Sequence, residues 1–377
     1  MKKYVTLGEI CRLNMGQSPD SSTYNDNGEG IPFYQGNADF GELHPITAHW
    51  CTSPTKVAGS GDILISVRAP IGALNIATEK CCIGRGLAAI TVGDDISRDF
   101  IWYMLKSRVT SLQAMGTGST FKAINKNVLN DMQFLLPSLD RQNEIAVNLS
   151  KIDAVIRICT ESLSKLDLLV KSRFVEMFGE PVLNPKGWTM ATIGDIVTEV
   201  KYGTSRPAVE GGKYAYLRMN NLTYDGHLDL ADLKRIDIPD NEIEKCIVRK
   251  GDVLFNRTNS VELVGKTCVF DEDEDMVIAG YIIRVRLKPV MLPLVLSCFM
   301  NTDALKAKLR DMAKGAVNQA NINAQELQSI KVYLPPLDLQ QQFAAFVEQT
   351  DKSKLAVKQV LEKAETLKKA LMQEYFG

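Results

Sequence analysis

Residues 136–179 read LPSLDRQNEIAVNLSKIDAVIRICTESLSKLDLLVKSRFVEMFG, and residues 334–377 read LPPLDLQQQFAAFVEQTDKSKLAVKQVLEKAETLKKALMQEYFG. Both stretches open on a proline-containing block and close on phenylalanine and glycine. Proline is a typical start signal of a helix, and glycine after the last turn is a typical stop signal. We therefore expect one long helix in each stretch, at 138–180 and 336–377.

Apolar side chains in the first stretch recur at alternating steps of four and three residues, which is the spacing of a coiled-coil seam. The second stretch repeats the pattern less cleanly, with Lys354 and Lys368 at core-like positions. Each helix would run about 60 Å at roughly 1.5 Å per residue, which is long for a small globule to cover. An amphipathic helix lying on its own globule is the alternative. The first seam comprises Ile145, Leu149, Ile152, Ile156, Cys159, Leu163, Leu166, Val170 and Met177.

The rest of the chain is also duplicated, which indicates a repeat architecture. GDIL at 61–64 recurs as GDVL at 251–254, and an arginine follows each block, Arg68 or Arg257, which we expect to occupy equivalent positions. Two copies in one chain suggest an approximate two-fold axis, which lays the long helices side by side and antiparallel. Further matching pairs are 7–10 with 193–196, 33–43 with 216–228, 124–125 with 322–323, and 135–142 with 333–340.

Each copy opens with a mixed part before its long helix. Short β-like runs at 62–67, 87–92, 252–255 and 281–287 are broken by Gly, Pro and Asn, and helical patterns follow at 98–113 and 293–312. The predicted fold class is α+β. It consists of two pseudo-repeated α/β globules, 1–137 and 181–335, separated by the long helices 138–180 and 336–377, which pack as an antiparallel coiled coil.

Composition narrows the function classes. The net charge is −1, with 18 basic and 19 acidic residues in 1–180 and 26 of each in 181–377, which is unusual for a chain that binds DNA alone. Eight cysteines without a Cys-x-x-Cys pair and only three histidines do not favour a metal site. No apolar run approaches the ~18 residues of a membrane span, and the first residues do not resemble a signal peptide. We expect a cytoplasmic protein with reduced thiols.

In the order of these duplicated blocks, the chain resembles the specificity subunits of type I restriction-modification systems over essentially its whole length. The blocks are GDIL and GDVL with the following arginine, the Asn125–Leu129 and Asn323–Leu327 stretches, and the LPSLDRQNEIA and LPPLDLQQQFA helix starts. Two departures are Ser138 where the second copy has Pro336, and Arg141 with Asn143 where the second helix carries glutamines.

The resemblance implies that each globule is a target-recognition domain for one half of a bipartite double-stranded DNA site. It implies that the helices set the distance between the half-sites and dock two adenine methyltransferase subunits, with a restriction subunit in systems that include one. S-adenosylmethionine would bind the methyltransferase subunits. This chain would therefore hold no cofactor, no metal and no catalytic residue.

Candidate DNA contacts follow from residue chemistry, because Arg pairs with guanine and Asn or Gln with adenine in the major groove. Lysines near a helix junction in 115–127 and 313–323 are candidates for phosphate. For each residue the alternative is a solvated loop side chain or a turn hydrogen bond, and Asn125 and Asn323 are equally suited to cap the helical turns that follow. The candidates are Gln17, Ser18, Gln35, Asn37, Arg68 and Lys122 in the first copy, and Thr204, Arg206, Arg218, Asn220, Arg257, Asn259 and Lys314 in the second.

Two other function classes are weighed against this one. SVELVGKT at 260–267 nearly matches a phosphate-binding loop, but Ser260 stands where the first glycine is required, and no methyltransferase motif is present, so an enzyme is disfavoured. The second rival is a non-catalytic coiled-coil scaffold that joins protein partners without sequence-specific DNA recognition. The near-neutral charge is compatible with it.

Overall fold

The computed structural model describes residues 3–118, 122–313 and 320–377. Its chain divides into two compact units: module 1 comprises Met1–Thr160 with Lys358–Gly377, and module 2 comprises Glu161–Val357. Both boundaries fall inside the two long helices, so each module contains a part of each helix. The predicted division into 1–137, 138–180, 181–335 and 336–377 stays a prediction.

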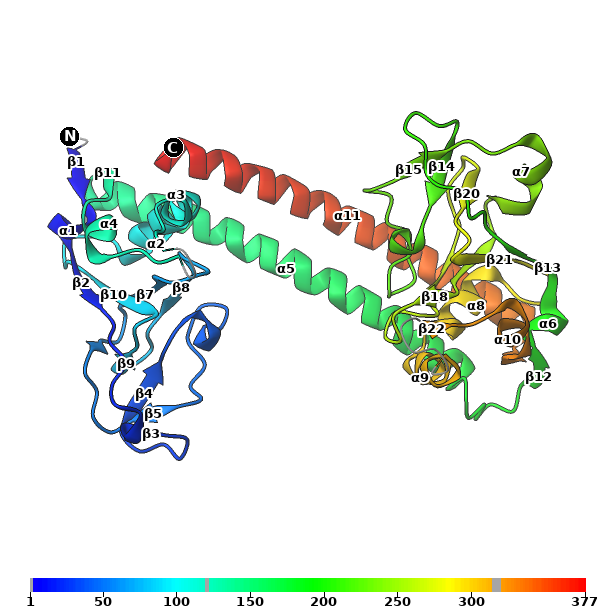
Figure 1. Cartoon of the computed structure of the whole chain (residues 1–377), viewed down its shortest axis with the longest axis horizontal. Coiled ribbons are helices and arrows are strands. Elements are labelled where there is room, and N and C mark those ends of the chain that lie inside the picture. Colours follow the sequence, from blue (N-terminus) through cyan, green and yellow to red (C-terminus); the bar gives the residue numbers. More distant parts are fainter. Residues whose placement is uncertain (1–2, 119–121, 314–319) are drawn as a thin grey trace. The chain divides into compact units, whose positions relative to one another are not determined.

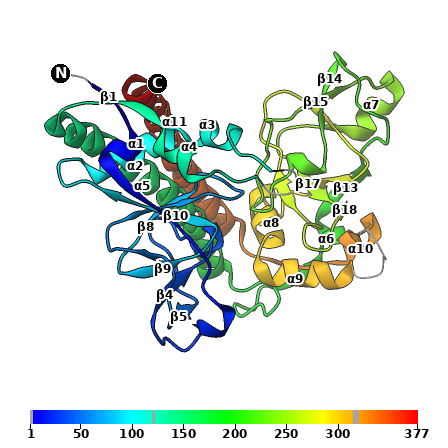
Figure 2. The ribbon, with the colours of Figure 1, turned by 60° about the vertical axis from the view of Figure 1, so that its left-hand side comes forward.

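Module 1 is built on the antiparallel sheet β2-β10-β7-β8 and a smaller sheet β3-β5-β4-β9-β6, in which β4 and β9 are parallel. Every residue of β7 is buried, because side chains on both of its faces contribute to hydrophobic clusters. Figures 1 and 2 place β4 and β5 at the end of the module away from α2 and α3. The strands are β1 (Lys3–Thr6), β2 (Cys11–Met15), β3 (Tyr24–Asn25), β4 (Ile31–Tyr34), β5 (Trp50–Cys51), β6 (Val57–Ala58), β7 (Ile63–Ser66), β8 (Leu74–Ile76), β9 (Cys81–Ile83), β10 (Leu87–Val92) and β11 (Gln133–Leu136), and the short helices are α1 (Leu7–Ile10), α2 (Arg98–Ser107), α3 (Val109–Ala114) and α4 (Lys126–Asn130).

Module 2 repeats this plan with the antiparallel sheet β13-β21-β17-β19 and a second sheet β15-β14-β20-β16, in which β14 and β20 are parallel. In both views β14, β15 and α7 lie at the end of the module away from α9. The strands are β12 (Thr189–Thr192), β13 (Val197–Tyr202), β14 (Tyr214–Leu217), β15 (Lys234–Ile236), β16 (Ile247–Val248), β17 (Val253–Asn256), β18 (Thr258–Asn259), β19 (Thr267–Val269), β20 (Met276–Ile278), β21 (Ile282–Leu287), β22 (Ala320–Asn321) and β23 (Lys331–Leu334), and the short helices are α6 (Ile193–Ile196), α7 (Asp240–Cys246), α8 (Pro293–Met300), α9 (Asp303–Met312) and α10 (Ala324–Ser329).

The strand register makes the central strands of the two modules equivalent, β7 with β17 and β8 with β19. Ile63 pairs with Ile76 in module 1, and Val253 pairs with Val269 in module 2. The duplicated GD block therefore begins the same central strand in both copies. The predicted β-like runs and the predicted α+β class are confirmed.

Each predicted helical pattern after the central sheet is in fact two helices. α2 and α3 are divided at Arg108, and α8 and α9 at Asn301 and Thr302. Side chains at both breaks bond back to helix carbonyls: Ser107 Oγ donates to Met104 O at 2.7 Å and Asn301 Nδ2 to Ser297 O at 2.9 Å. Such bonds compete with the helical ladder, which a periodicity argument does not detect.

The long helices are α5 (Leu139–Phe178), which begins two residues after Pro137, and α11 (Leu337–Phe376), which begins directly after Pro336. Gly179 follows α5 with φ +87°, the left-handed conformation of a helix stop. In module 1 the start of α5 meets the end of α11, where Asp153 Oδ1 lies 2.6 Å from Lys368 Nζ. In module 2 the end of α5 meets the start of α11, where the rings of Phe174 and Phe343 are 5.6 Å apart. The two helices are therefore packed antiparallel, as predicted.

Lysines in the predicted second seam are accommodated by carboxylates of the opposite helix. Lys354 is 8% exposed, and its Nζ lies 2.7 Å from Asp167 Oδ1. Burial is the largest single influence and acts to lower the pKa of Lys354, but the hydrogen bonds and charges of Asp167 and Asp351 together outweigh it, and the net direction is upward. The poorer apolar pattern of α11 thus marks an ion pair inside the helix interface.

A buried glutamine ties each long helix to its own module. Gln142 accepts a hydrogen bond from Ser97 N at 2.9 Å, just before α2, and Gln340 accepts one from Leu292 N at 2.8 Å, just before α8. Both side chains also donate to a carbonyl of the preceding proline turn. The repeated LPxLDxQ block is therefore a structural joint. Among the helices of the described ranges, none has the length and apolarity needed to cross a membrane.

Candidate DNA interface

A glycine that ends the first strand of the main sheet shapes the same hollow in both modules. Gly16 follows β2, and Gly203 follows β13. A Cβ atom on Gly16 would lie 2.1 Å from Gly84 O, and one on Gly203 would lie 2.1 Å from Ile278 O. Only glycine allows this close backbone approach. The residues after it, Gln17 and Thr204, are the first predicted contacts of each copy.

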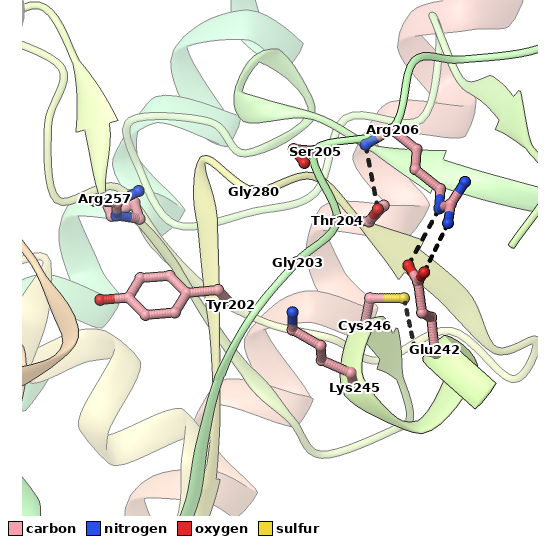
Figure 3. A pocket seen from close by; sticks show the side chains of 10 residues that line it. All are labelled: Tyr202, Gly203, Thr204, Ser205, Arg206, Glu242, Lys245, Cys246, Arg257 and Gly280. Atoms are coloured by element: carbon pink, nitrogen blue, oxygen red, sulfur yellow. Dashed lines mark hydrogen bonds and ion pairs between the residues drawn. The ribbon is translucent and has the colours of Figure 1, made fainter. Parts of the chain in front are cut away.

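Module 2 carries two adjoining pockets at this position, with volumes of about 560 and 490 Å³. They share a wall made of Thr204, Arg206, Arg257 and Gly280, and Figure 3 shows the first pocket. The second pocket adds Arg218 and Asn220. Five predicted residues from distant parts of the sequence are thus brought together: Thr204, Arg206, Arg218, Asn220 and Arg257.

Arg206 and Glu242 form a bidentate ion pair at the rim of the first pocket (Figure 3). Arg206 Nε donates to Glu242 Oε2 at 3.1 Å, and Nη2 donates to Oε1 at 2.6 Å. The hydrogen bond lowers the pKa of Glu242 and raises that of Arg206. The arginine fork is held in a fixed orientation, which is the geometry that guanine or phosphate recognition requires.

Arg257 lies over the ring of Tyr202, with its Cζ 4.9 Å from the ring centroid. Tyr202 is fixed in turn, since its hydroxyl accepts a hydrogen bond from Ala324 N at 2.8 Å. In the part of the chain that the structure describes, Nε of Arg257 and Nε of Arg218 are buried without a hydrogen-bond partner. The Nε groups of both arginines are thus buried donors that the described residues do not satisfy, beside the pockets.

The other predicted contacts of module 2 differ in whether their polar groups are already used within the module. Arg218 donates to Asp232 Oδ2 at 2.8 Å, and Asn220 is exposed. Asn259 uses both ends of its amide inside the module, donating to Asn256 Oδ1 and accepting from Ser260 N. Lys314 lies outside the described residues.

Module 1 has a smaller pocket of about 380 Å³ beside Gln17. Its wall includes three exposed cations, Lys56, Arg85 and Lys126, together with Asn14. Sequence reasoning missed all three cations. One signal was available: Arg85 stands between Gly84 and Gly86, a spacing that presents a side chain on a tight turn.

Backbone hydrogen bonds gather the predicted residues of module 1 around that Gly-Arg-Gly turn. Ser18 Oγ accepts from Arg85 N at 3.4 Å, and Gln35 O accepts from Gly86 N at 3.1 Å. Asn37 begins a 3-10 turn (Asn37–Asp39) just after Gln35. Arg68 and Lys122 are exposed and close to each other, since Ala69 N donates to Lys122 O at 3.2 Å.

The predicted equivalence of Arg68 and Arg257 is wrong by one residue. Ile124 N donates to Val67 O, and Ile322 N donates to Arg257 O, both at 2.9 Å. Arg257 therefore corresponds to Val67, and Arg68 corresponds to Thr258. A shift of one position along an extended chain turns the side chain to the opposite face, so the two arginines face different surroundings.

Three motifs singled out in the sequence have structural roles. The side chain of Asn125 accepts from Val128 N, and that of Asn323 accepts from Gln325 N and Glu326 N, so both residues cap helices. In the near-match to a phosphate-binding loop, Lys266 is 6% exposed and Thr267 begins β19. This lysine faces the interior of the module, where its amine donates to a backbone carbonyl.

Among the described residues, α7 has no counterpart helix at the pocket of module 1, and a buried arginine holds α7 in place. Arg284 is fully buried on β21 and donates to Glu199, to Ile247 O and to Glu244 O at 3.3 Å. The last two carbonyls belong to the end of α7 and the residue after it, and α7 also carries Glu242. The same position of β10 in module 1 is Ala89, because Leu254 pairs with Arg284 as Leu64 pairs with Ala89.

The fold and pockets together define a duplicated α+β protein with arginine-lined pockets in both modules, beside Gly16 and beside Gly203. The family described as type I restriction modification DNA specificity domain matches the chain twice, at residues 2–168 and 185–366. The chain therefore belongs to the family of type I restriction-modification DNA specificity proteins.

Named relatives agree with this family. The chain is 45% identical over 157 residues to a Methanocaldococcus jannaschii protein with the provisional name of type I restriction enzyme MjaX specificity subunit, covering 41% of this chain and 37% of that protein. It is 29% identical over 190 residues to the MjaIX specificity subunit of the same organism, covering 44% and 43%. It is 20% identical over 382 residues to the EcoBI specificity subunit of Escherichia coli, covering 92% and 78%. The chain thus matches less than half the length of the first two relatives.

Solved structures share the fold over the whole chain. The S subunit of a type I system from M. genitalium superposes with a TM-score of 0.62 at 15% identity, covering 100% of this chain and 96% of that one. A chain from a structure of type I complex assembly and conformational transition gives the same TM-score at 18% identity, covering 100% and 97%. At these identities the likeness concerns the fold alone.

Proposed function

We propose that this chain recognises a bipartite double-stranded DNA target, with each module binding one half. The observation that carries the proposal is the duplicated hollow after Gly16 and Gly203, lined in each module by the side-chain types that pair with base edges and phosphates. Because the two linings differ, the two modules would recognise different bases. The antiparallel helices α5 and α11 would fix the separation of the half-sites.

The partners in this proposal are two adenine methyltransferase subunits, with restriction subunits in systems that include them. Both long helices present apolar side chains to solvent outside their seam, which supports docking of another protein. S-adenosylmethionine and the chemistry of methyl transfer would belong to the methyltransferase subunits, and the complex would act in the cytoplasm, where its DNA is. The exposed apolar residues are Val147, Val155, Ile158, Leu168, Leu169, Val175, Leu355, Val360 and Leu367.

The partner subunits also account for the charge balance. A net charge of −1 provides little attraction for phosphate beyond the local clusters. We therefore expect the isolated chain to bind DNA weakly and the complex to bind it tightly.

The direct test is co-expression of the chain with the products of its neighbouring genes, followed by mapping of methylated adenines across the host genome. A motif in two parts with a fixed gap is the expected result. DNA binding by the complex that ignores sequence would favour the scaffold alternative, and catalysis by the purified chain alone would favour an enzyme.

A second test shows which module recognises which half of the DNA target. Arg68→Ala should relax recognition of one half-site, and Arg257→Ala should relax recognition of the other, each by about 10-fold for one lost bidentate contact. Equal losses at both half-sites from either variant would contradict two independent recognition modules. Arg98→Ala is the matched control, because Arg98 is an exposed arginine that lines none of the three pockets.

A further inference from the structure

In each module, some of the candidate base contacts lie on one loop segment, which directly follows a strand of the second sheet. In module 2 it is residues 218–232, after β14, and it contributes Arg218 and Asn220 to the pocket. In module 1 it is residues 35–47, after β4, and it contains Gln35 and Asn37. We name these the 218–232 segment and the 35–47 segment.

Lys266 holds the 218–232 segment from inside module 2. Its Nζ donates to Met219 O at 2.6 Å, and Met219 stands between Arg218 and Asn220. The side chain is 6% exposed, so its amine is directed into the module and away from any external phosphate. Both pocket residues therefore depend on a carbonyl that a buried ammonium group fixes.

Asn75 holds the 35–47 segment of module 1 in the corresponding way. Its amide accepts from Gly41 N at 3.2 Å and donates to Gly41 O at 3.1 Å, and the residue is 1% exposed. Asn75 lies in β8 and Lys266 immediately precedes β19, and these two strands are equivalent in the duplicated sheet. The same edge strand thus fixes the segment in both modules, through different residues.

Lys266 has a defined counterpart in module 1, because the strand hydrogen bonds align the two sequences at this position. Asn256 N donates to Lys266 O at 2.8 Å, and Ser66 N donates to Ala73 O at 2.8 Å, so Lys266 corresponds to Ala73. A lysine side chain at that position reaches the turn directly after β14, whereas the alanine reaches nothing comparable. In module 1 the contact is made by Asn75, two residues after Ala73, whose side chain bonds to Gly41 in the 35–47 segment.

We propose that Lys266 and Asn75 are positioning residues for DNA recognition, each setting the placement of the base-contacting segment of its own module. This inference rests on the proposed function. In this proposal Lys266, the lysine of the apparent GKT motif, supports DNA recognition without contacting DNA. Each residue should affect one half-site only.

The test uses the intact complex of this chain with its methyltransferase partners and a DNA duplex carrying the motif found by methylation mapping. Lys266→Met and Asn75→Leu keep the side-chain volume and remove the hydrogen bonds. For each variant, the Kd is measured for the cognate duplex and for duplexes with one changed base in either half. We expect Lys266→Met to lose about 10-fold in discrimination at one half-site, and Asn75→Leu to lose about as much at the other.

A double-mutant cycle separates positioning from general destabilisation. If Lys266 acts through Asn220, then Lys266→Met adds little to the loss of discrimination in an Asn220→Ala background. Lys213→Met, an exposed lysine of the same module, is the matched control and should leave both half-sites unchanged. If Lys266→Met does not yield soluble complex, Lys266→Gln is used, and hydrogen exchange of residues 218–232 in the complex should become faster than in the wild type.

Two outcomes overturn the inference: unchanged discrimination at both half-sites, or equal loss at both from a single variant. Additive losses in the cycle also count against it. A wild-type complex that methylates no split motif would instead overturn the proposed function, so the two failures are distinguishable.

Discussion

The two modules share their backbone register but differ in the polar groups buried beneath it. Module 2 contains Arg284 and Lys266 where module 1 contains Ala89 and Ala73. The cations around the module 1 pocket are exposed, whereas Arg206 of module 2 is paired with Glu242. A duplicated scaffold thus keeps its strand pairing, its glycines and its helix joints, and it changes the side chains that place its recognition segments.

The largest expected effect comes from the buried ion cluster that is specific to module 2. Arg284→Met removes the donor to Glu199 and to the carbonyls of Ile247 and Glu244, and although Arg286 still pairs with Glu199 and Asp252, each carbonyl left unpaired typically costs about 1–3 kcal/mol. Urea unfolding should show destabilisation, with hydrogen exchange accelerated in α7 and β21 and unchanged in β10. Unaltered stability would mean that the cluster contributes nothing.

Substitutions at Gly16 and Gly203 test whether the two modules have equivalent hollows. Gly16→Ala and Gly203→Ala both force a Cβ into a carbonyl oxygen, so each should cost about 1–3 kcal/mol, as overpacking does. The two losses should be similar, as measured by denaturant unfolding of each variant. Gly36→Ala is a control for a glycine with open space around its Cβ position and a φ of −167°, which alanine also adopts. A large difference between Gly16→Ala and Gly203→Ala would break the equivalence of the two hollows.

The glutamine joints provide a second matched pair with a smaller effect. Gln142→Ala and Gln340→Ala each leave a part-buried backbone N–H unpaired, at Ser97 and Leu292, for a loss of about 1 kcal/mol. Thermal unfolding of the two variants should show comparable shifts. If only one variant is destabilised, the repeated block has different roles in the two copies.

The smallest expected change in stability is at the pocket rim. Glu242→Gln removes the ionic partner of Arg206, and because exposed ion pairs contribute little to stability, the unfolding midpoint should stay within experimental error. The same variant should weaken discrimination at the half-site of module 2, because the arginine fork loses its fixed orientation. Loss of stability without loss of discrimination would assign the pair a structural role.

Much of the architecture could be predicted because it depends on patterns along the chain. The heptad spacing, the flanking prolines and the ordered blocks predicted two long helices and a duplicated α+β fold. They did not predict that Ser107 and Asn301 interrupt the helical patterns, because the competing hydrogen bonds depend on the local position of carbonyls. The equivalence of Arg68 and Arg257 failed for a related reason, since spacing after a motif does not give strand register.

The site was predictable in residue type and less so in position. Five predicted residues of module 2 line adjoining pockets because their loops follow β13, β14 and β17, whose ends converge there. Lys56, Arg85 and Lys126 were missed, since no local pattern shows that their loops converge. Lys266 stood in a near-match to a phosphate-binding loop that Ser260 already disfavoured, and its burial and hydrogen bond show that it supports the backbone instead.

The division of the modules inside the long helices has a consequence for how the protein is made. Phe376 is 6% exposed in the core of module 1, with its ring 5.3 Å from that of Phe100. A chain emerging from the ribosome therefore cannot complete its N-terminal module until synthesis has passed Phe376. Prematurely terminated products lack part of that core, so incomplete chains would be left without a finished first module and open to proteolysis.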